Sequence, residues 1–200
     1  MTSFQPFICN RVSVLILGLL GAFSVQATVI DTQAIYNQAV LAHQIQGSYP
    51  DSAYAIAQEM ERVSMESNYQ EGIAFAHMRM GYLDNIRGRN TRAKWYMNSV
   101  IDIRKDLQDY EGAAYACITL SYIYQNTGFP DSAFLVMYNA LKYQEPTQNE
   151  ALLGSIHLQL AYLGSIYNHD ENEIIAHFEK AKSIAKSHND TTALIELYSQ

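Results

Sequence analysis

The residues with the most distinctive chemistry are one cysteine and two histidines that recur at a single spacing. His77, Cys117 and His157 are evenly spaced along the chain. Cysteine and histidine are zinc ligands, and a cysteine close to a histidine can act as a nucleophile. However, zinc ligands must converge to about 2.0–2.3 Å from one ion, and these three residues belong to successive sequence elements. Since Cys117 also lies within an apolar helical pattern, we predict three packing residues, no metal site and no cofactor.

The other patterns that would indicate catalysis or phosphate binding are missing from the 200 residues. The sequence contains no HExxH, CxxC or GxSxG motif and no glycine-rich phosphate loop. The carboxylate pairs Asp102/Asp106 and Glu171/Glu173 fall on polar helix faces or in a turn, as solvated surface residues do. The formal net charge is −7, whereas binding to a phosphate backbone needs clustered Lys and Arg. We therefore expect neither enzymatic activity nor a nucleic-acid partner.

At the level of secondary-structure elements, residues 109–148 predict a helix hairpin. Apolar residues recur three or four positions apart in two runs, at Leu120, Ile123 and Tyr124, and then at Ala133, Met137, Ala140 and Leu141. Between the runs, Gly128 can end the first helix, and Pro130 can open the second because the first helical position needs no N–H group. The predicted unit is about 40 residues long, which is within the range of known structural repeats.

This hairpin recurs along the chain. The shift that places Gly112 on Gly72 also places Tyr122 on Tyr82 and Tyr162 on Tyr122. A shift of twice that length places the four letters PDSA at 130–133 on the same four letters at 50–53. Self-similarity at such a period is typical of a solenoid. We predict an all-α solenoid of four helix hairpins and the start of a fifth.

The predicted helices are bounded by turn residues. The leading helices of the first, second and fourth hairpins are expected at about 31–46, 71–86 and 151–167. Their partners are expected from Pro50 to about Ser64, after a capping Asn90, and beyond the turn at 168–172. The core-facing residues on these helices are Ile35, Ala39, Ala42, Ala93, Met97, Val100, Ile174, Phe178, Ala181 and Ile184.

Residues 30–200 resemble tetratricopeptide repeats. The third hairpin carries the pattern best, with Leu120, Ser121 and Tyr124 followed by Ala133, Met137 and Ala140. The period of about 40 residues exceeds the usual period of about 34 residues, as in the longer-repeat branch of that family. His77, Cys117 and His157 occupy the family's signature tryptophan position. The resemblance implies a right-handed superhelix whose leading helices line a concave wall. Small residues at Gly81, Ser121 and Ala161 would let paired helices approach closely.

The resemblance also assigns a row of residues to the concave wall. Those residues are Phe75, Arg79, Tyr82, Asn85, Tyr115, Thr119, Tyr122, Gln125, Gln159, Tyr162 and Ser165. Three tyrosines then form a ladder with amides and a hydroxyl beside it, which favours a groove for a peptide or a protein. The alternative is that the tyrosines pack helix against helix. The family's clamp for a C-terminal carboxylate is not expected, since Arg79 is the only cation in the row.

The N-terminus has the pattern of a secretory signal peptide. Arg11 precedes a twelve-residue apolar run at 12–23, and a Val-x-Ala sequence ends at Ala27. We predict a signal peptide at 1–27 and a repeat domain at 28–200. An uncleaved anchor over 12–30 is the alternative. Both place the domain outside the cytoplasm, in the periplasm, and loss of Cys9 would leave Cys117 without a disulfide partner.

Residues 192–198 begin a fifth leading-helix pattern without a polar capping helix. Repeat arrays need such a cap, so we expect a repeat domain truncated from a longer chain. The resulting hypothesis is the sensor region of a bacterial signal-transduction protein that binds a protein or peptide. Two alternatives stay open. One is a free-standing periplasmic scaffold, and the other is an accessory region of an enzyme whose catalytic domain follows residue 200.

Overall fold

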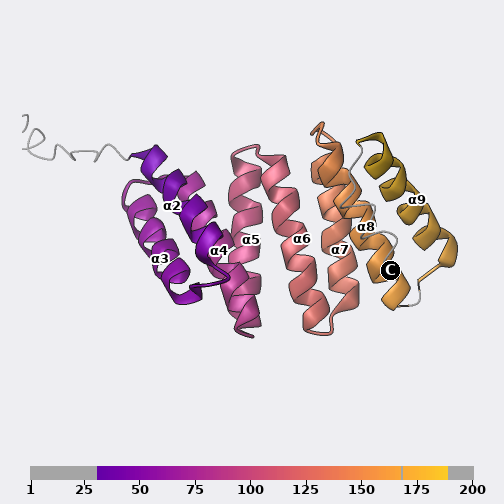
Figure 1. Cartoon of the computed structure of the whole chain (residues 1–200), viewed down its shortest axis with the longest axis horizontal. Helices are drawn as coiled ribbons and strands as arrows, with labels where there is room; N and C mark the ends of the chain where they lie inside the picture. The colour runs from indigo at the N-terminus through magenta and orange to yellow at the C-terminus, as the bar shows by residue number, and fades with distance from the viewer. Residues whose placement is uncertain (1–30, 168, 189–200) are drawn as a thin grey trace, which may run out of the picture.

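The computed structural model describes residues 31–167 and 169–188 as an all-helical stack. Each helix packs against the next one along the chain (Figure 1), and the described residues contain no β-strand. The helices are α2 (Thr32–Ile45), α3 (Pro50–Glu66), α4 (Gln70–Ile86), α5 (Asn90–Asp106), α6 (Tyr110–Asn126), α7 (Pro130–Gln144), α8 (Glu150–Ile166) and α9 (Glu171–Ser187). The predicted all-α class and the succession of paired helices are confirmed.

The helix starts follow local chemistry. Pro50 and Pro130 open α3 and α7, as predicted for a residue without a backbone N–H. Side chains cap α2, α6, α8 and α9 by accepting a backbone N–H, for example Asp109 from Gly112 at 2.8 Å. The predicted capping role of Asn90 is wrong. Asn90 is the first residue of α5, and Arg89 occupies the cap position without a side-chain hydrogen bond.

The turns inside the second and third hairpins share one glycine geometry. Gly88 and Gly128 adopt φ of 71° and 76°, a left-handed conformation that glycine tolerates without steric cost. At Gly128 the flanking N–H groups donate back to the end of α6, Phe129 N to Tyr124 O at 2.9 Å and Gly128 N to Gln125 O at 3.1 Å. These bonds satisfy carbonyl groups that a helix end leaves unpaired, which is why the chain reverses there.

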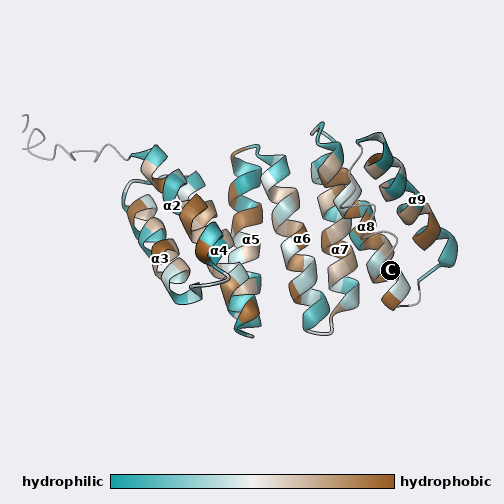
Figure 2. Ribbon diagram, viewed as in Figure 1, coloured by the Kyte–Doolittle hydropathy of each residue, from teal (hydrophilic) through white to brown (hydrophobic). Residues whose placement is uncertain are grey.

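The core lies between neighbouring helices and contains the predicted apolar positions. Ala93, Met97, Val100, Ala133, Met137 and Ala140 are fully buried, and Ile35 and Ala42 are buried on α2. On α9, Ala181 is buried, while Ile174, Phe178 and Ile184 are half-buried. Each helix therefore carries apolar and polar stretches side by side (Figure 2). Because Cys117, the cysteine within the described residues, is free, burial of these stripes is the main stabilising term for this part of the chain.

Small residues set the spacing within a hairpin. A Cβ atom on Gly81 would lie 2.2 Å from Met97 Cε and 3.0 Å from Tyr96 Cβ. Met97 Cε is the end of a flexible side chain and could move, but the contact with Tyr96 Cβ is tighter than a normal carbon contact, so the absence of a side chain on Gly81 lets α4 and α5 approach closely here. This confirms the role predicted for Gly81.

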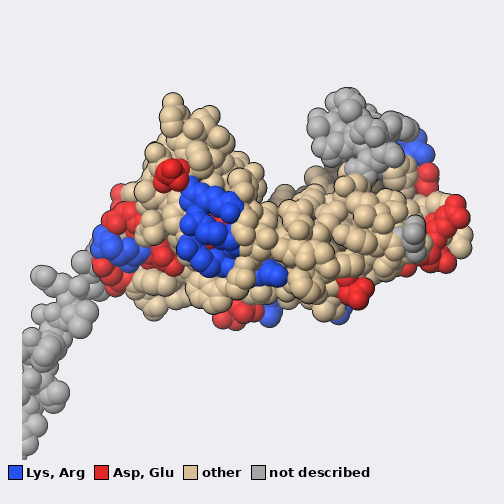
Figure 3. Space-filling model, turned by 90° about the horizontal axis from the view of Figure 1, so that it is seen from below, with Lys and Arg blue, Asp and Glu red and all other residues tan. Residues whose placement is uncertain are grey.

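Charged side chains join the first hairpin to the second. The guanidinium groups of Arg87, Arg89 and Arg92 lie 5.1–5.9 Å from the centre of the Tyr54 ring. Beneath them, the fully buried Asp84 carboxylate lies 2.9 Å from the Nε atoms of Arg89 and of Arg92. A group of basic side chains is visible on the face that includes the α4–α5 turn (Figure 3). We interpret these three arginines as residues that stabilise the contact between the first and second hairpins, since Arg89 and Arg92 neutralise the buried carboxylate of Asp84.

Some predictions concern residues outside the described ranges. They are the signal peptide or anchor within 1–30, position 168 of the last turn, and the helix start at 192–198. Among the helices that the structure does describe, none is long and apolar enough to cross a membrane.

Candidate functional site

The helices that lead each hairpin lie closer to one another than the trailing helices do. Successive leading helices touch, α2 with α4, α4 with α6, and α6 with α8. Contact of that extent does not occur among α3, α5, α7 and α9 within the described residues. Elements on the inside of a curved stack are closer together than those on the outside. We call the exposed side of α2, α4, α6 and α8 the inner face, and the surface is hollowed beside the projecting N-terminal helices (Figure 3).

Large aromatic side chains are exposed along this inner face. Tyr82, Tyr115 and Tyr122 have exposed fractions of 38%, 46% and 44%, and Tyr162 is half-buried. Phe75 is half-buried, with its ring 6.2 Å from the ring of Tyr36 in an edge-on arrangement. The predicted aromatic residues thus lie on the leading helices α4, α6 and α8, and three of them present much of their surface to solvent.

The polar residues predicted for the wall differ in how they are placed. Thr119 and Ser165 donate their hydroxyl hydrogens to carbonyls of their own helices, Tyr115 O at 3.2 Å and Tyr162 O at 2.8 Å. Asn85 and Gln125 are half-buried, whereas Gln159 is only 6% exposed. In this structure, Gln159 lies between helices and not on the solvent-facing surface.

The sequence alone did not reveal which residues of the first hairpin are equivalent to those of the later hairpins. The spacing between the first and second leading helices is one residue longer than the other spacings. The leading helices end at Ile45, Ile86, Asn126 and Ile166, so the first of the three intervals is one residue longer than the other two. An extra residue in the first turn, at 46–49, causes the offset, and counting turn lengths would have revealed it. With this correction, Leu41 is equivalent to Tyr82 and is 45% exposed on the inner face.

The same correction places Gln38, Arg79, Thr119 and Gln159 at one equivalent position. Three of these residues carry a buried polar atom with no hydrogen-bond partner among the described residues, namely Gln38 Oε1, Arg79 Nε and Gln159 Nε2. Buried polar atoms in native proteins usually have a partner, so a recurrent exception on one face is informative. The inner face therefore combines exposed aromatic rings with unsatisfied polar groups just beneath them.

The row of His77, Cys117 and His157 behaves differently. His77 and Cys117 are buried at 2% and 1% exposure, as predicted for packing residues. The His77 ring nitrogens contact Ser99 Oγ at 2.8 Å and Glu61 Oε1 at 2.9 Å. Burial lowers the pKa of His77, although Glu61 opposes that shift. Burial also raises the pKa of the Cys117 thiol to about 12, which disfavours the reactive thiolate.

His157 is half-buried and pairs with a histidine on the neighbouring helix. Its Nδ1 lies 2.9 Å from Nδ1 of His177, and one ring must donate to the other while both are neutral. Burial, followed by the nearby His177 and Lys180, lowers the pKa of His157 to about 4. Within residues 31–167 and 169–188, no three His, Cys, Asp or Glu side chains are grouped so that they could hold a metal ion.

Comparisons with known proteins assign the chain to no family. No protein-family model matches the chain, and no curated protein is detectably similar to it in sequence. Functional inference therefore rests on the helical stack and on its inner face.

Proposed function

We propose that the chain is a non-catalytic repeat domain of the tetratricopeptide type that binds a protein or peptide on its inner face. In this proposal the stack is a right-handed superhelix, and the groove runs across α2, α4, α6 and α8. The observation that carries it is the exposed aromatic row of Tyr82, Tyr115 and Tyr122, at 38–46% exposure. Tyrosine offers a large rigid surface with a polar tip at low entropic cost, which is why binding surfaces are rich in it.

The location and the wider role extend the same proposal. The apolar run at 12–23 and the Val-x-Ala ending at Ala27 favour export to the periplasm. Outside the cytoplasm, a peptide-binding repeat domain suits the sensor or interaction region of a bacterial signal-transduction protein. The acidic net charge of −7 is consistent with a protein or peptide partner and unfavourable for nucleic acid.

The test separates binding from packing at Tyr122. The full chain is applied to an array of acetylated decapeptides of varied sequence, and binding of Tyr122→Ala is compared with wild type at equal folded concentration. We expect affinity for the bound peptides to fall roughly tenfold or more, as for an aromatic residue central to an interface. We expect the melting temperature to change by less than about 3 °C, because the side chain is 44% exposed.

The opposite pattern would contradict the proposal. If Tyr122→Ala lowered the melting temperature strongly while each folded molecule bound peptides as before, the tyrosine ladder would be packing. Failure of wild type to bind any peptide on the array would count against the groove itself.

A further inference from the structure

Arg79 occupies an unusual environment in the middle of the inner face. It lies on α4 at the position shared with Gln38 and Gln159, and three residues before the exposed Tyr82. Its Nη1 donates to the side-chain oxygen of Gln46, while its Nε is buried without an acceptor among the described residues. A guanidinium group has five N–H donors, and a buried donor without an acceptor costs free energy.

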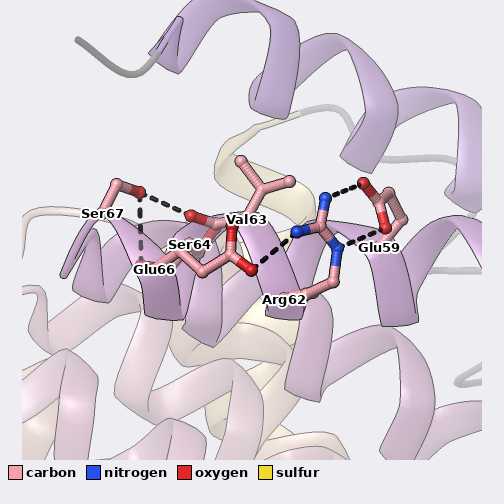
Figure 4. Close-up of polar contacts among 6 residues, drawn as sticks. All are labelled: Glu59, Arg62, Val63, Ser64, Glu66 and Ser67. Atoms are coloured by element: carbon pink, nitrogen blue, oxygen red, sulfur yellow. Dashed lines mark hydrogen bonds and ion pairs between the residues drawn. The ribbon is translucent and has the colours of Figure 1, made fainter. Parts of the chain in front are cut away.

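Among the described residues, Arg79 has no carboxylate within ion-pair distance, and in this it differs from the other described arginines. All five other arginines in residues 31–167 and 169–188 lie within ion-pair distance of an acidic side chain: Arg62, Arg87, Arg89, Arg92 and Arg104. Arg62, for example, lies between Glu59 and Glu66 on the exposed side of α3 (Figure 4). The chain contains 20 Asp and Glu against 13 Lys and Arg, so acidic partners are not scarce in general.

The comparison with Arg104 shows what pairing normally provides. Arg104 is 9% exposed, lies 2.6 Å from Asp109 Oδ2, and covers the Phe75 ring at 4.7 Å. Its burial is offset by a carboxylate and by an aromatic face. Arg79 is half-buried, and the neighbours that the structure describes supply only an amide oxygen and no anion. Burial accordingly lowers the pKa of Arg79, with only the Tyr82 hydroxyl opposing the shift.

Resting on the proposed function, we propose that the inner face selects peptide segments that carry an acidic side chain, whose carboxylate pairs with Arg79. A carboxylate at this point would supply the missing anion and accept from the guanidinium in a charge-assisted hydrogen bond. The adjacent Tyr82 and Phe75 would contact the flanking peptide with their rings. The partner is then a peptide with Asp or Glu next to apolar or aromatic residues.

The surrounding charge argues for one carboxylate and against a polyanion. Arg79 is the only Lys or Arg among the residues of α2, α4, α6 and α8, in a chain with a net charge of −7. A nucleic acid or an anionic lipid surface requires several cations in contact with many phosphates. The Arg87–Arg89–Arg92 cluster does not provide them, because those arginines are already paired with Asp51 and Asp84.

The test uses matched pairs of acetylated, C-terminally amidated decapeptides that differ only by Glu or Gln at one position. We expect wild type to bind the Glu peptide roughly tenfold more tightly than its Gln twin, the usual scale for a charge-assisted hydrogen bond. Arg79→Gln should bind both peptides equally, and Arg79→Lys should keep part of the preference. Arg62→Gln is the matched control and should keep all of it, because Arg62 is an exposed arginine on α3.

Each other outcome overturns the proposal. Equal binding of Glu and Gln peptides by wild type, while Tyr122→Ala still weakens binding, would refute acid selection and leave the peptide groove intact. A preference for the Glu peptide that persists in Arg79→Gln would assign recognition of the carboxylate to another group. No binding of any peptide would refute the groove and acid selection together. The wild-type comparison needs no variant, so it stands even if Arg79→Gln is poorly folded.

Discussion

Two rows of side chains share the same period and have opposite environments. On α6, Leu120 is fully buried against α5, and Tyr122, two residues further on, is 44% exposed on the inner face. The same contrast holds between the row that contains His77 and Cys117 and the row that contains Tyr82. A repeat in sequence therefore identifies equivalent positions, but it does not show whether such a position serves packing or binding.

The difference follows from the geometry of the stack. A side chain directed between two helices of the stack is covered on several sides, whereas one on the inner face is covered only by the adjacent leading helices. Exposure thus separates residues that stabilise the fold from residues that are available to a partner. The boundary between packing positions and inner-face positions is not sharp. Gln159 belongs to the inner face by its spacing, but only 6% of it is exposed.

The largest effect is expected on the buried side of α6. Leu120→Ala should lower the free energy of unfolding by about 3 kcal/mol, because it removes buried methyl groups and leaves a cavity beside Met97 and Ile123. Urea denaturation followed by circular dichroism measures the change. Tyr122→Ala is the matched control on the exposed side of the same helix. Equal destabilisation by both substitutions would show that both sides of α6 are packing surfaces, and it would refute the contrast between the buried and the exposed side of this helix.

A pH-dependent effect is expected from His157 in the packing row. Its pKa of about 4 in the folded chain lies below the value of about 6.5 for an unfolded histidine, so the unfolded state binds more protons between these pH values. The free energy of unfolding should therefore fall as pH drops from about 6.5 to about 4. For one proton the slope approaches about 1.4 kcal/mol per pH unit.

His157→Gln isolates that contribution. The variant should lose less stability than wild type over the same pH range, when both are measured by urea denaturation at successive pH values. Carboxylates and His77 titrate in both proteins, so the difference between the two curves reports on His157 and its neighbours His177 and Lys180. Parallel curves would mean that the pKa of His157 does not differ between the folded and the unfolded chain.

Much of the fold could be predicted because its signals are local. Proline at the first helical position, glycine in a left-handed turn and apolar residues every three or four positions each act within one hairpin, and Pro130, Gly128 and Met137 are where they were expected. The error at Asn90 was avoidable. The repeat places Asn90 on Pro130, which is the first residue of α7, and Asn90 is likewise the first residue of α5. The turn that contains Gly88 lies between the end of α4 at Ile86 and this residue.

The inner face was only partly predictable, because exposure depends on distances between helices that spacing does not contain. The sequence assigned Tyr82, Tyr122 and Gln159 to one wall, but it could not tell that Gln159 would be covered and Tyr122 would not. It also could not reveal that no carboxylate of residues 31–167 and 169–188 lies within ion-pair distance of Arg79, since that follows from where the acidic side chains of other helices lie. Leu41 was missed for a simpler reason, the extra residue in the first turn.

The smallest effect is expected for an exposed apolar residue on a trailing helix. Leu135 on α7 is 63% exposed, more than Tyr122, but it is outside the inner face. Leu135→Ser should change the free energy of unfolding by less than about 0.5 kcal/mol, as surface substitutions usually do, and peptide binding on the decapeptide array should be unchanged. If Leu135→Ser weakened binding as much as Tyr122→Ala, exposure alone would decide binding, and the distinction between leading and trailing helices would fail.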